Sequence, residues 1–322
     1  MESPAMREVN RVLRAVAPKE VVISLIGESG TGKDVMARRI HEMSHRRSGP
    51  FVPINCAAIP DALFESELFG HERGAFTGAI ERARGKLEAA SGGTLFLDEV
   101  GEMPMTMQAK LLRFLETRKF MRVGGSTKIS VDARIVCATL RPIEDDVKAG
   151  RFRGDLFYRL QGIALKIPPL RERQADIAPI VRQFTAELSA RHATKPPTYA
   201  RSAMAVMLAY SWPGNIRELR NVVELACLLR EGKVVRVDDL PEPVRREVTV
   251  GASDAAVLPP AAEVSIRLDR PLEEIVTTVL EAALLLEGGN RSRAARRLGV
   301  SIRTMQRFAA RGRIRAKPAT RH

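Results

Sequence analysis

A glycine-rich loop carries the residue types needed to hold the phosphates of a nucleotide. It reads Gly27-Glu28-Ser29-Gly30-Thr31-Gly32-Lys33, follows an apolar run and precedes a helical pattern. In such a loop glycines let backbone N–H groups turn toward phosphates, the helix N-terminus adds positive potential, and a lysine reaches the β and γ phosphates. This order of strand, loop and helix predicts an ATP site at residues 27–34, in which Asp34 follows the lysine and has no assigned metal contact.

A second stretch ends in two carboxylates that suit phosphoryl transfer. In Thr94-Leu95-Phe96-Leu97-Asp98-Glu99 the apolar residues are typical of a buried strand, and the acids come at its end. We expect Asp98 to position Mg²⁺ and Glu99 to polarise the attacking water. An acidic pair after a strand is common by itself, but together with the loop at residues 27–33 it predicts ATP hydrolysis.

Between these two stretches lies an uncharged hexapeptide, Gly74-Ala75-Phe76-Thr77-Gly78-Ala79. Neither a helix nor a strand pattern accounts for one aromatic and one hydroxyl side chain bracketed by glycines. A flexible apolar tip inserted between the two halves of an ATPase site indicates a part that moves when ATP is hydrolysed. The alternative interpretation is an ordinary glycine-rich surface turn.

The first 170 residues supply the elements that must position these groups. Short, nearly continuous apolar runs predict strands buried on both faces of a parallel sheet, at residues 21–26, 51–55, 94–98, 133–139 and 163–167. Helical segments lie between them, and one over residues 107–115 spaces its leucines to face inward. Residues 1–170 therefore predict an α/β domain with phosphate chemistry at the carboxyl ends of its strands.

Beyond residue 170 the strand signal stops. Helical patterns at residues 175–191, 200–210 and 215–230 predict a small helical lid over residues 171–240, and the turn Trp212-Pro213-Gly214-Asn215 starts its last helix. Residues 241–270 combine many alanines with four prolines, so we expect a flexible linker there.

Residues 271–322 predict an all-α domain that ends in a helix-turn-helix. Pro271 suits the first position of a helix with an apolar stripe, and Gly288-Gly289 suits its end. A short helix over residues 290–299 would turn Ala294, Ala295 and Leu298 inward. Ser301 would then cap a second helix over residues 302–310, after a turn at Gly299-Val300.

Positive charge is concentrated in this last domain. Of the chain's net charge of +14, residues 290–322 contribute eleven basic side chains and no acidic one, which leaves +3 upstream. Such a block is an electrostatic footprint for a polyanion. The side chains expected to reach base edges are Arg303, Thr304, Gln306 and Arg307, and those expected to meet DNA phosphates are Arg291, Arg293, Arg311 and Arg313. A basic hairpin that binds RNA or acidic protein is the alternative.

Composition favours a soluble protein of more than one domain. Among 322 residues there is neither a basic-then-apolar leader nor an apolar run that could span a bilayer, so we expect a cytoplasmic protein. Cys56, Cys137 and Cys227 are odd in number and widely spaced, which favours reduced, buried thiols. The stretch His41-Glu42-Met43-Ser44-His45 matches a zinc-protease pattern with both histidines on one helical face, but without a further ligand we expect no zinc there.

The hexapeptide and the run Glu65-Ser66-Glu67-Leu68-Phe69-Gly70-His71-Glu72 upstream of it resemble a known family. This family is the bacterial enhancer-binding proteins, the NtrC-type AAA+ activators of sigma-54 RNA polymerase, and the resemblance covers nearly the whole chain. It implies a AAA+ ATPase with a helical lid, a Fis-type DNA-binding domain, and a hexapeptide that grips sigma-54. Family members usually carry an N-terminal regulatory domain. This sequence starts within a few residues of the expected ATPase and shows no such domain. We therefore expect control by a trans-acting protein, by abundance alone, or by a domain absent from this sequence.

The resemblance also implies roles for single residues. Asn55 matches the asparagine that holds the catalytic glutamate until the partner is engaged. Arg153 and Arg159 match arginines that enter a neighbouring subunit's site, and Arg217 matches the lid arginine that senses nucleotide. One position departs from the pattern, because Leu140 stands where the family has an asparagine and cannot donate the hydrogen bond that senses the γ phosphate.

We therefore expect a sigma-54-dependent activator that uses ATP and Mg²⁺ to open a promoter complex. Its expected partners are upstream DNA, the sigma-54 RNA polymerase holoenzyme and other subunits, in a homo-oligomer from dimer to hexameric ring or a hetero-oligomer with a related activator. Two alternatives stay open. One is a DNA-binding regulator whose ATPase has weakened or decayed, which Leu140 supports, and the other is a different AAA+ remodeller, which needs no such hexapeptide.

The division of the basic side chains between bases and phosphates is testable. Arg307→Ala should relax sequence preference by about 1–3 kcal/mol, whereas Arg313→Ala should weaken all sequences alike and reduce the salt dependence. The measurement is the affinity for a selected and a random duplex across salt concentrations. Equal effects of the two substitutions on both duplexes would refute the division.

Overall fold

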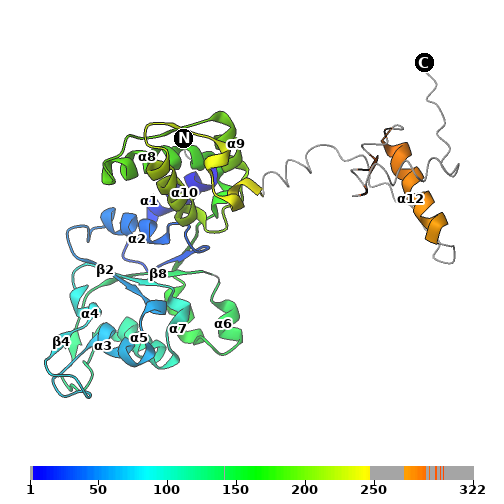
Figure 1. The fold of residues 1–322 in the computed structure, drawn as a ribbon. Helices are drawn as coiled ribbons and strands as arrows, with labels where there is room; N and C mark the ends of the chain where they lie inside the picture. The colour runs from blue at the N-terminus through cyan, green and yellow to red at the C-terminus, as the bar shows by residue number, and fades with distance from the viewer. Residues whose placement is uncertain are drawn as a thin grey trace. The chain divides into compact units, whose positions relative to one another are not determined.

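The protein, here a computed structural model, divides into two compact units, Met1–Gly251 and Ala252–His322 (Figure 1). Residues 3–140, 142–246 and 272–287 are described, together with Asn290, Ala294, Ala295, Leu298 and Val300. The first unit contains a parallel sheet and a helical lid, and the described residues of the second include a long helix and apolar residues that pack on it.

A five-stranded parallel sheet forms the centre of the first unit. Its strands run in the order β2 (Phe51–Asn55), β5 (Thr94–Asp98), β8 (Arg134–Thr139), β1 (Ile23–Ile26) and β9 (Ile163–Lys166). Because every pair is parallel, the carboxyl ends meet at one edge, where Asn55 lies opposite Asp98 and Ile26 opposite Thr139. The five strands predicted from apolar runs are confirmed, with small shifts at their ends.

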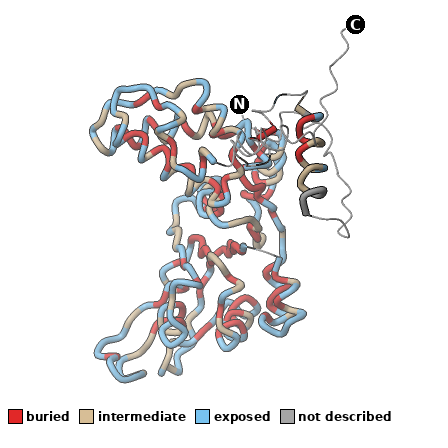
Figure 2. The backbone as a smooth tube through the Cα atoms, turned by 45° about the vertical axis from the view of Figure 1, so that its right-hand side comes forward, coloured by how far each residue is buried: buried red, intermediate tan, exposed pale blue. Residues whose placement is uncertain are grey.

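Helices cover both faces of this sheet. On one face α1 (Pro4–Val16) and α2 (Lys33–Glu42) share a core with Phe96, and on the other α3 (Asp61–Phe69), α5 (Met105–Thr117) and α7 (Gly154–Leu160) share a core with Leu95 and Leu97. Successive side chains of a strand point to opposite faces, which is why these neighbours belong to different cores. All six residues of β8 are buried. Figure 2 shows buried stretches in the interior of the first unit and exposed ones at its surface.

Shorter elements connect the large ones. They are η1 (Cys56–Ala58), the antiparallel pair β3 (Gly70–His71) and β4 (Ala83–Arg84), α4 (Lys86–Ala89), η2 (Val100–Glu102), the antiparallel pair β6 (Lys119–Phe120) and β7 (Ile129–Ser130), and α6 (Glu144–Lys148). The three cysteines are free and buried, as predicted, and burial raises the pKa of the Cys56 thiol to about 12.

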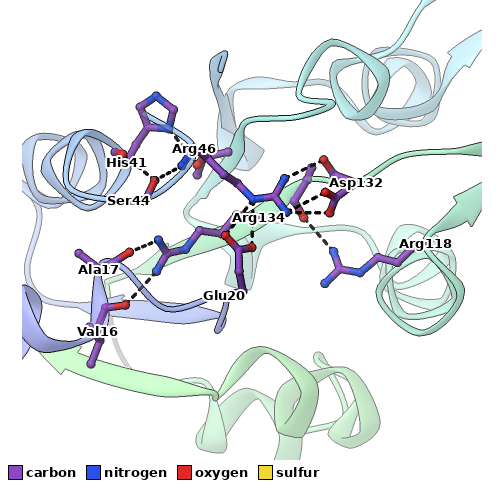
Figure 3. A network of polar contacts seen from close by, with 11 residues as sticks. Val16, Ala17, Glu20, His41, Ser44, Arg46, Arg118, Asp132 and Arg134 are labelled. Carbon is purple, nitrogen blue, oxygen red and sulfur yellow. Dashed lines mark hydrogen bonds and ion pairs between the residues drawn. The ribbon is translucent and has the colours of Figure 1, made fainter. Parts of the chain in front are cut away.

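Arg134, the first residue of β8, ties the sheet to the end of α1 (Figure 3). Its guanidinium donates to the backbone oxygens of Ala17 and Val16. Carbonyl oxygens in the last turn of a helix lack the amide partners of the helix interior and carry partial negative charge. The buried guanidinium therefore offers these oxygens both hydrogen-bond donors and a positive charge. Beside it Arg46 bonds the carboxylates of Glu20 and Asp132 nearer the surface.

A helical lid follows the sheet. It contains η3 (Leu170–Glu172), η4 (Gln174–Asp176), α8 (Ile177–Arg191), β10 (Thr198–Tyr199), α9 (Arg201–Ala209), α10 (Asn215–Leu229), β11 (Val234–Val235) and η5 (Val237–Asp239), so the three predicted lid helices are confirmed. Trp212 lies at the centre of its core, fully buried, with Nε1 donating to the Met207 oxygen at 2.8 Å. Among the described residues no helix has both the length and the apolar run needed to cross a bilayer.

The lid core runs past residue 240 into the segment expected to be a linker. Leu240 and Val244 are buried in it, and residues 242–246 are helical. Leu240 directly follows η5 in an extended conformation, and Val244 lies within the helical residues. Residues 247–270 lie outside the described residues, and the expectation of a linker there stays a prediction.

The second unit begins with α12 (Leu272–Leu286), which confirms the predicted helix. Leu280, Ala283 and Leu284 of α12 form a buried cluster with Ala294 and Ala295. The Ala294 N–H donates to the Asn290 oxygen at 3.0 Å, which is the i to i+4 spacing of the predicted short helix. The candidate DNA-contacting residues lie outside the described residues: Arg291, Arg293, Ser301, Arg303, Thr304, Gln306, Arg307, Arg311 and Arg313.

Candidate nucleotide site and the hairpin hexapeptide

The glycine-rich loop at residues 27–33 joins β1 to α2 at the carboxyl edge of the sheet. Lys33 is buried, and its ammonium donates to the Gly27 oxygen at 2.8 Å and to the Glu28 oxygen at 3.1 Å. The Thr31 hydroxyl donates to the same Glu28 oxygen at 2.8 Å. The loop is therefore shaped by its own side chains around the start of a helix, where backbone N–H groups favour a phosphate.

Asp98 and Glu99 follow β5 and interact electrostatically with this lysine. Burial lowers the pKa of Lys33, and the negative charges of Asp98 and Glu99 oppose that change. Burial likewise raises the pKa of Asp98, and the charge of Lys33 opposes it. The structure thus brings together the two halves of the predicted site, a lysine and an acidic pair whose charges are held in a partly buried setting.

Glu99 leaves the strand in a left-handed conformation, with φ 52° and ψ 47°. This conformation is uncommon for a residue with a side chain and is frequent at functional sites. Within the described residues the side chain of the neighbouring Asn55 forms no hydrogen bond with Glu99, and the role that the family implies for Asn55 stays a prediction. Its Oδ1 accepts the Ala57 N–H at 3.0 Å, because the side chain caps η1.

The candidate arginines divide into one that reaches this loop and two that do not. Arg217, in the first turn of α10, donates from Nη1 to the Ser29 hydroxyl at 2.8 Å. Arg153 is exposed directly before α7, where it forms a two-point ion pair with Asp155, and Arg159 is exposed within α7. Within the described part of the chain neither makes a hydrogen bond or ion pair with the glycine-rich loop, so in one subunit they are outward-facing cations.

Leu140 also lies at this edge of the sheet. It follows β8 directly, and 40% of its surface is exposed. The residue before it, Thr139, accepts the Gly27 N–H on its backbone oxygen at 3.2 Å. Leu140, which replaces the asparagine typical of the family, therefore directly follows a residue that is hydrogen-bonded to the glycine-rich loop.

The histidine pair does not share a helical face, which corrects the sequence expectation. α2 ends at Glu42, so His45 lies in the turn that follows. His41 is buried, and its Nδ1 lies 2.9 Å from the Thr94 hydroxyl. The Nδ1 atom of His41 is thus hydrogen-bonded within the protein interior, and burial lowers the pKa of this histidine.

Side chains of the lid form hydrogen bonds with the glycine-rich loop that the sequence patterns did not predict. These bonds, made by Arg171 and Asn215, are here called the latch. Arg171 of η3 donates to both carboxylate oxygens of Glu28, at 2.6 and 2.8 Å. The fully buried Asn215 donates to the Ser29 oxygen at 3.0 Å and to Glu28 at 3.2 Å, and its Oδ1 accepts the Leu170 N–H at 2.7 Å. Glu28 therefore contacts the lid with its side chain, and only its backbone remains for phosphates.

This latch depends on ionised Glu28. The hydrogen bond from Arg171, followed by the one from Asn215, lowers the pKa of Glu28 from 4.5 to about 2. A carboxyl with a depressed pKa stabilises the folded state above its ordinary pKa and loses that contribution as the pH falls toward the depressed value. The Glu28 contacts should therefore be intact at neutral pH and weaken between about pH 4.5 and 2.

The hexapeptide is presented on a hairpin that follows α3. The pair β3 and β4 forms its base, and the Gly74 N–H donates to the Ala79 oxygen at 2.8 Å to close the loop. Phe76 is 40% exposed and meets the His71 ring edge-on at 5.0 Å, and Thr77 is exposed. The predicted flexible tip is therefore a closed turn with its aromatic and hydroxyl side chains accessible.

Residues 121–125, here called the support loop, lie against this hairpin. Val123 donates its N–H to the Gly70 oxygen at 2.9 Å and accepts the Glu72 N–H at 3.0 Å. Arg122, whose side chain is 8% exposed, forms ion pairs with Glu72 at 2.7 Å and Glu88 at 2.6 Å. The hexapeptide thus rests on a segment that no sequence motif had indicated.

This fold and site define a AAA+ P-loop NTPase with a helical lid, joined to a helical C-terminal unit. Residues 1–166 match the sigma-54 interaction domain, residues 171–256 the AAA+ ATPase lid domain, and residues 271–307 the Fis family of bacterial regulatory proteins. The chain belongs to the sigma-54 interaction domain family.

Relatives and solved structures agree with this family. The chain is 43% identical over 303 residues to the regulatory protein AtoC of Escherichia coli, covering 94% of this chain and 65% of AtoC, and 43% identical over 314 residues to the transcriptional regulatory protein FlbD of Caulobacter vibrioides, covering 95% and 68%. NtrX from Brucella abortus in complex with ATP superposes with a TM-score of 0.69 at 35% identity, covering 96% of this chain and 68% of NtrX. The chain thus spans about two thirds of the length of these relatives.

Asn215 is predicted to stabilise the first unit through its buried hydrogen bonds. Asn215→Ala leaves the Leu170 N–H without this partner and keeps a side chain at a φ of 52°, so we expect a loss of about 3 kcal/mol. The measurement is urea unfolding followed by fluorescence of Trp212, the single tryptophan, which lies in the lid core.

The matched control is Asn221→Ala, the same change at an exposed position of the same helix. It should alter the free energy of unfolding by no more than about 0.5 kcal/mol. Equal stabilities of the two variants would contradict a stabilising role for Asn215.

Proposed function

We propose that this chain is the ATP-driven core of a sigma-54-dependent transcriptional activator. The observation that carries the proposal is the exposed hexapeptide, raised on a hairpin of a P-loop domain that belongs to the sigma-54 interaction family. Hydrolysis would shift the hexapeptide against sigma-54 and open the promoter complex, with Phe76 supplying apolar grip and Thr77 a specific contact. The names of AtoC and FlbD, both regulators, are consistent with this proposal.

ATP is the proposed nucleotide, held by the backbone of residues 27–32 and by Lys33. The complex of Brucella abortus NtrX with ATP supports this choice. Lys33 would exchange its bonds to loop carbonyls for phosphate oxygens, and Arg217 would reach the phosphates from the lid beside Ser29. Glu99, directly after β5, would orient the attacking water and accept its proton.

Mg²⁺ is the proposed metal, and the residues at the strand ends fit it. Mg²⁺ at a nucleotide is held by one or two carboxylates, phosphates and waters, and in that setting it neutralises charge on the phosphates. Asp98 is a half-buried carboxylate whose pKa is raised by burial. Burial disfavours its negative charge, so a bound cation would stabilise the ionised form. Asp34 is exposed in the first turn of α2, and we assign it no metal contact.

A ring of subunits would complete the site. Arg153, directly before α7, and Arg159, within α7, are both exposed. Positive charge that they supply to a neighbouring subunit would stabilise the transition state. We infer a homo-oligomer, up to a hexamer, or a hetero-oligomer with a related activator. The Fis-type segment at residues 271–307 would hold this assembly on upstream DNA.

A DNA-binding regulator with a weakened ATPase is the second candidate. The exposed Leu140 favours it, because a leucine one residue from the Thr139 to Gly27 bond cannot sense the γ phosphate. Lys33, Asp98 and Glu99 are all in place, which favours the active enzyme.

Thr77→Ala separates contact with sigma-54 from hydrolysis. We expect ATP turnover within about twofold of the unsubstituted protein, because Thr77 is exposed far along the hairpin, and loss of open complexes on a sigma-54 promoter. The assay combines purified protein, sigma-54 holoenzyme, promoter DNA and ATP, with Lys33→Ala as the variant that cannot hydrolyse.

The matched control is Thr106→Ala, which removes an exposed hydroxyl from the start of α5 and should retain both activities. Joint loss of turnover and open complexes in Thr77→Ala would mean that the residue is structural. Open complexes that form without hydrolysis would overturn the mechanism.

Leu140→Asn tests the second candidate. Restoring an amide should raise ATP turnover by up to about tenfold, the size of a gained charge-assisted hydrogen bond in the transition state. The same substitution at Leu228, exposed on α10, is the control and should leave turnover unchanged. Unchanged turnover and unchanged promoter opening in Leu140→Asn would exclude a weakened sensor.

A further inference from the structure

A cavity separate from the nucleotide site lies between α3, α5 and the segment that joins β6 to β7. Its volume is about 470 Å³, and none of its lining residues belongs to the glycine-rich loop or to the Asp98-Glu99 pair. Sites for small molecules commonly enclose about 300–1,000 Å³. The cavity is therefore large enough for a ligand of the size of a mononucleotide.

Positive charge converges on this cavity from three segments. The basic lining residues are Lys110, Arg113, Lys119, Arg122 and Lys128. The single acidic one, Glu65, is paired with Lys110, and Arg122 is paired with Glu72 and Glu88 outside the lining. Within the described residues the side chains of Arg113, Lys119 and Lys128 take part in no hydrogen bond or ion pair. A concave wall focuses the field of unpaired charges, so the cavity should attract an anion.

Apolar side chains also line the cavity. Phe69 and Phe120 are buried, with ring centroids 5.7 Å apart, and Met121 is 42% exposed. Aromatic and thioether side chains favour contact with a flat ring rather than with a fully hydrated ion. The ligand that suits both the basic and the apolar lining is an anion that carries a ring system.

The support loop connects this cavity to the hexapeptide. Residues 121–125 form one wall, and Val123 bonds the backbone at Gly70 and Glu72, at the start of the hairpin. A Cβ built on Gly124 would lie 2.8 Å from the Ala75 Cβ, so no side chain fits between the support loop and the hexapeptide. A shift of the support loop must therefore displace Ala75 or open a gap.

We propose that this cavity binds a small phosphate-bearing aromatic ligand and that its occupancy changes the exposure of the hexapeptide. The unpaired cations contact the phosphate, and the ring lies over Phe69 and Phe120. The site acts as an effector site beside the moving part, and its ligand binding does not depend on sigma-54, DNA or hydrolysis.

The test is a fluorescence titration of the full chain with 2-naphthyl phosphate, in the presence of saturating ADP and Mg²⁺ to fill the nucleotide site. 2-Naphthol and inorganic phosphate carry the two halves of the probe, and each should bind at least about tenfold more weakly than the whole. The double variant Arg113→Gln/Lys128→Gln should weaken the naphthyl phosphate at least about tenfold, because two charge-assisted contacts are lost.

The control is Lys19→Gln/Arg201→Gln, which removes two exposed charges that do not line the cavity. It should bind the probe as the unsubstituted protein does, and unfolding followed by Trp212 should show that both doubles are folded. No saturable binding by the unsubstituted protein, or equal weakening in both doubles, would overturn the site.

Hydrogen exchange tests the link to the hexapeptide. Bound 2-naphthyl phosphate should slow the exchange of backbone amides in residues 119–128 and change it in residues 74–79, through the Gly124 and Ala75 contact. Protection of residues 119–128 with no change at residues 74–79 would overturn the link, and protection of other segments alone would overturn the position of the site.

Discussion

The approach of the lid to the glycine-rich loop is the constraint on which the first unit depends. The Gly30 oxygen accepts the Ile216 N–H at 2.9 Å, and a Cβ on Gly30 would lie 2.3 Å from the Gly214 oxygen. No side chain fits between the two backbones, so the positions of loop and lid are set together. Arg173 adds a bond to the Thr31 oxygen at 2.8 Å, and Ser3 ties α1 to the same lid through Asp176. A change in the loop around a phosphate is therefore transmitted to the lid without an intermediate.

The same contact resolves an electrostatic conflict. Glu28 lies in a loop that must attract phosphates, and a free carboxylate there would repel them. Arg171 and Asn215 draw its side chain to the lid and hold it ionised, with its pKa lowered to about 2. Of the carboxylates that remain near Lys33, Asp98 and Glu99 stand at the strand end where a metal and a water would use them, and Asp34 lies in the first turn of α2. One acidic residue thus serves the joint between subdomains, and two serve the chemistry.

Sequence patterns predicted the elements better than the contacts between them. The strands were predictable because burial on both faces leaves continuous apolar runs, and the phosphate loop because its glycines and lysine have a fixed spacing. The pair of Arg171 and Glu28 is 143 residues apart and has no local signal. Asn215 was visible only as a turn residue before a helix, and Pro241 and Pro243 favoured a linker where Val244 is buried in the lid core. Asn55 caps η1 with its side chain, and its residue type alone did not predict this role because asparagine also occurs at many positions that are not caps.

Continuity of the chain explains how the strand ends can act on the hexapeptide. Asn55 ends β2 opposite Asp98 and caps η1, α3 begins at Asp61, and its last residue, Phe69, is followed at once by the hairpin. A helix of nine residues spans about 13 Å and moves as one body. At the hairpin base a Cβ on Gly85 would meet the Phe69 backbone at 2.4 Å, whereas one on Gly74 or Gly78 would meet nothing within 4 Å. Close packing therefore fixes the base of the hairpin to the end of α3, whereas the two glycines of the hexapeptide are not confined by neighbouring atoms. A displacement of α3 must carry the hexapeptide with it. The exposed side chains of Phe76 and Thr77 remain free to bind a partner.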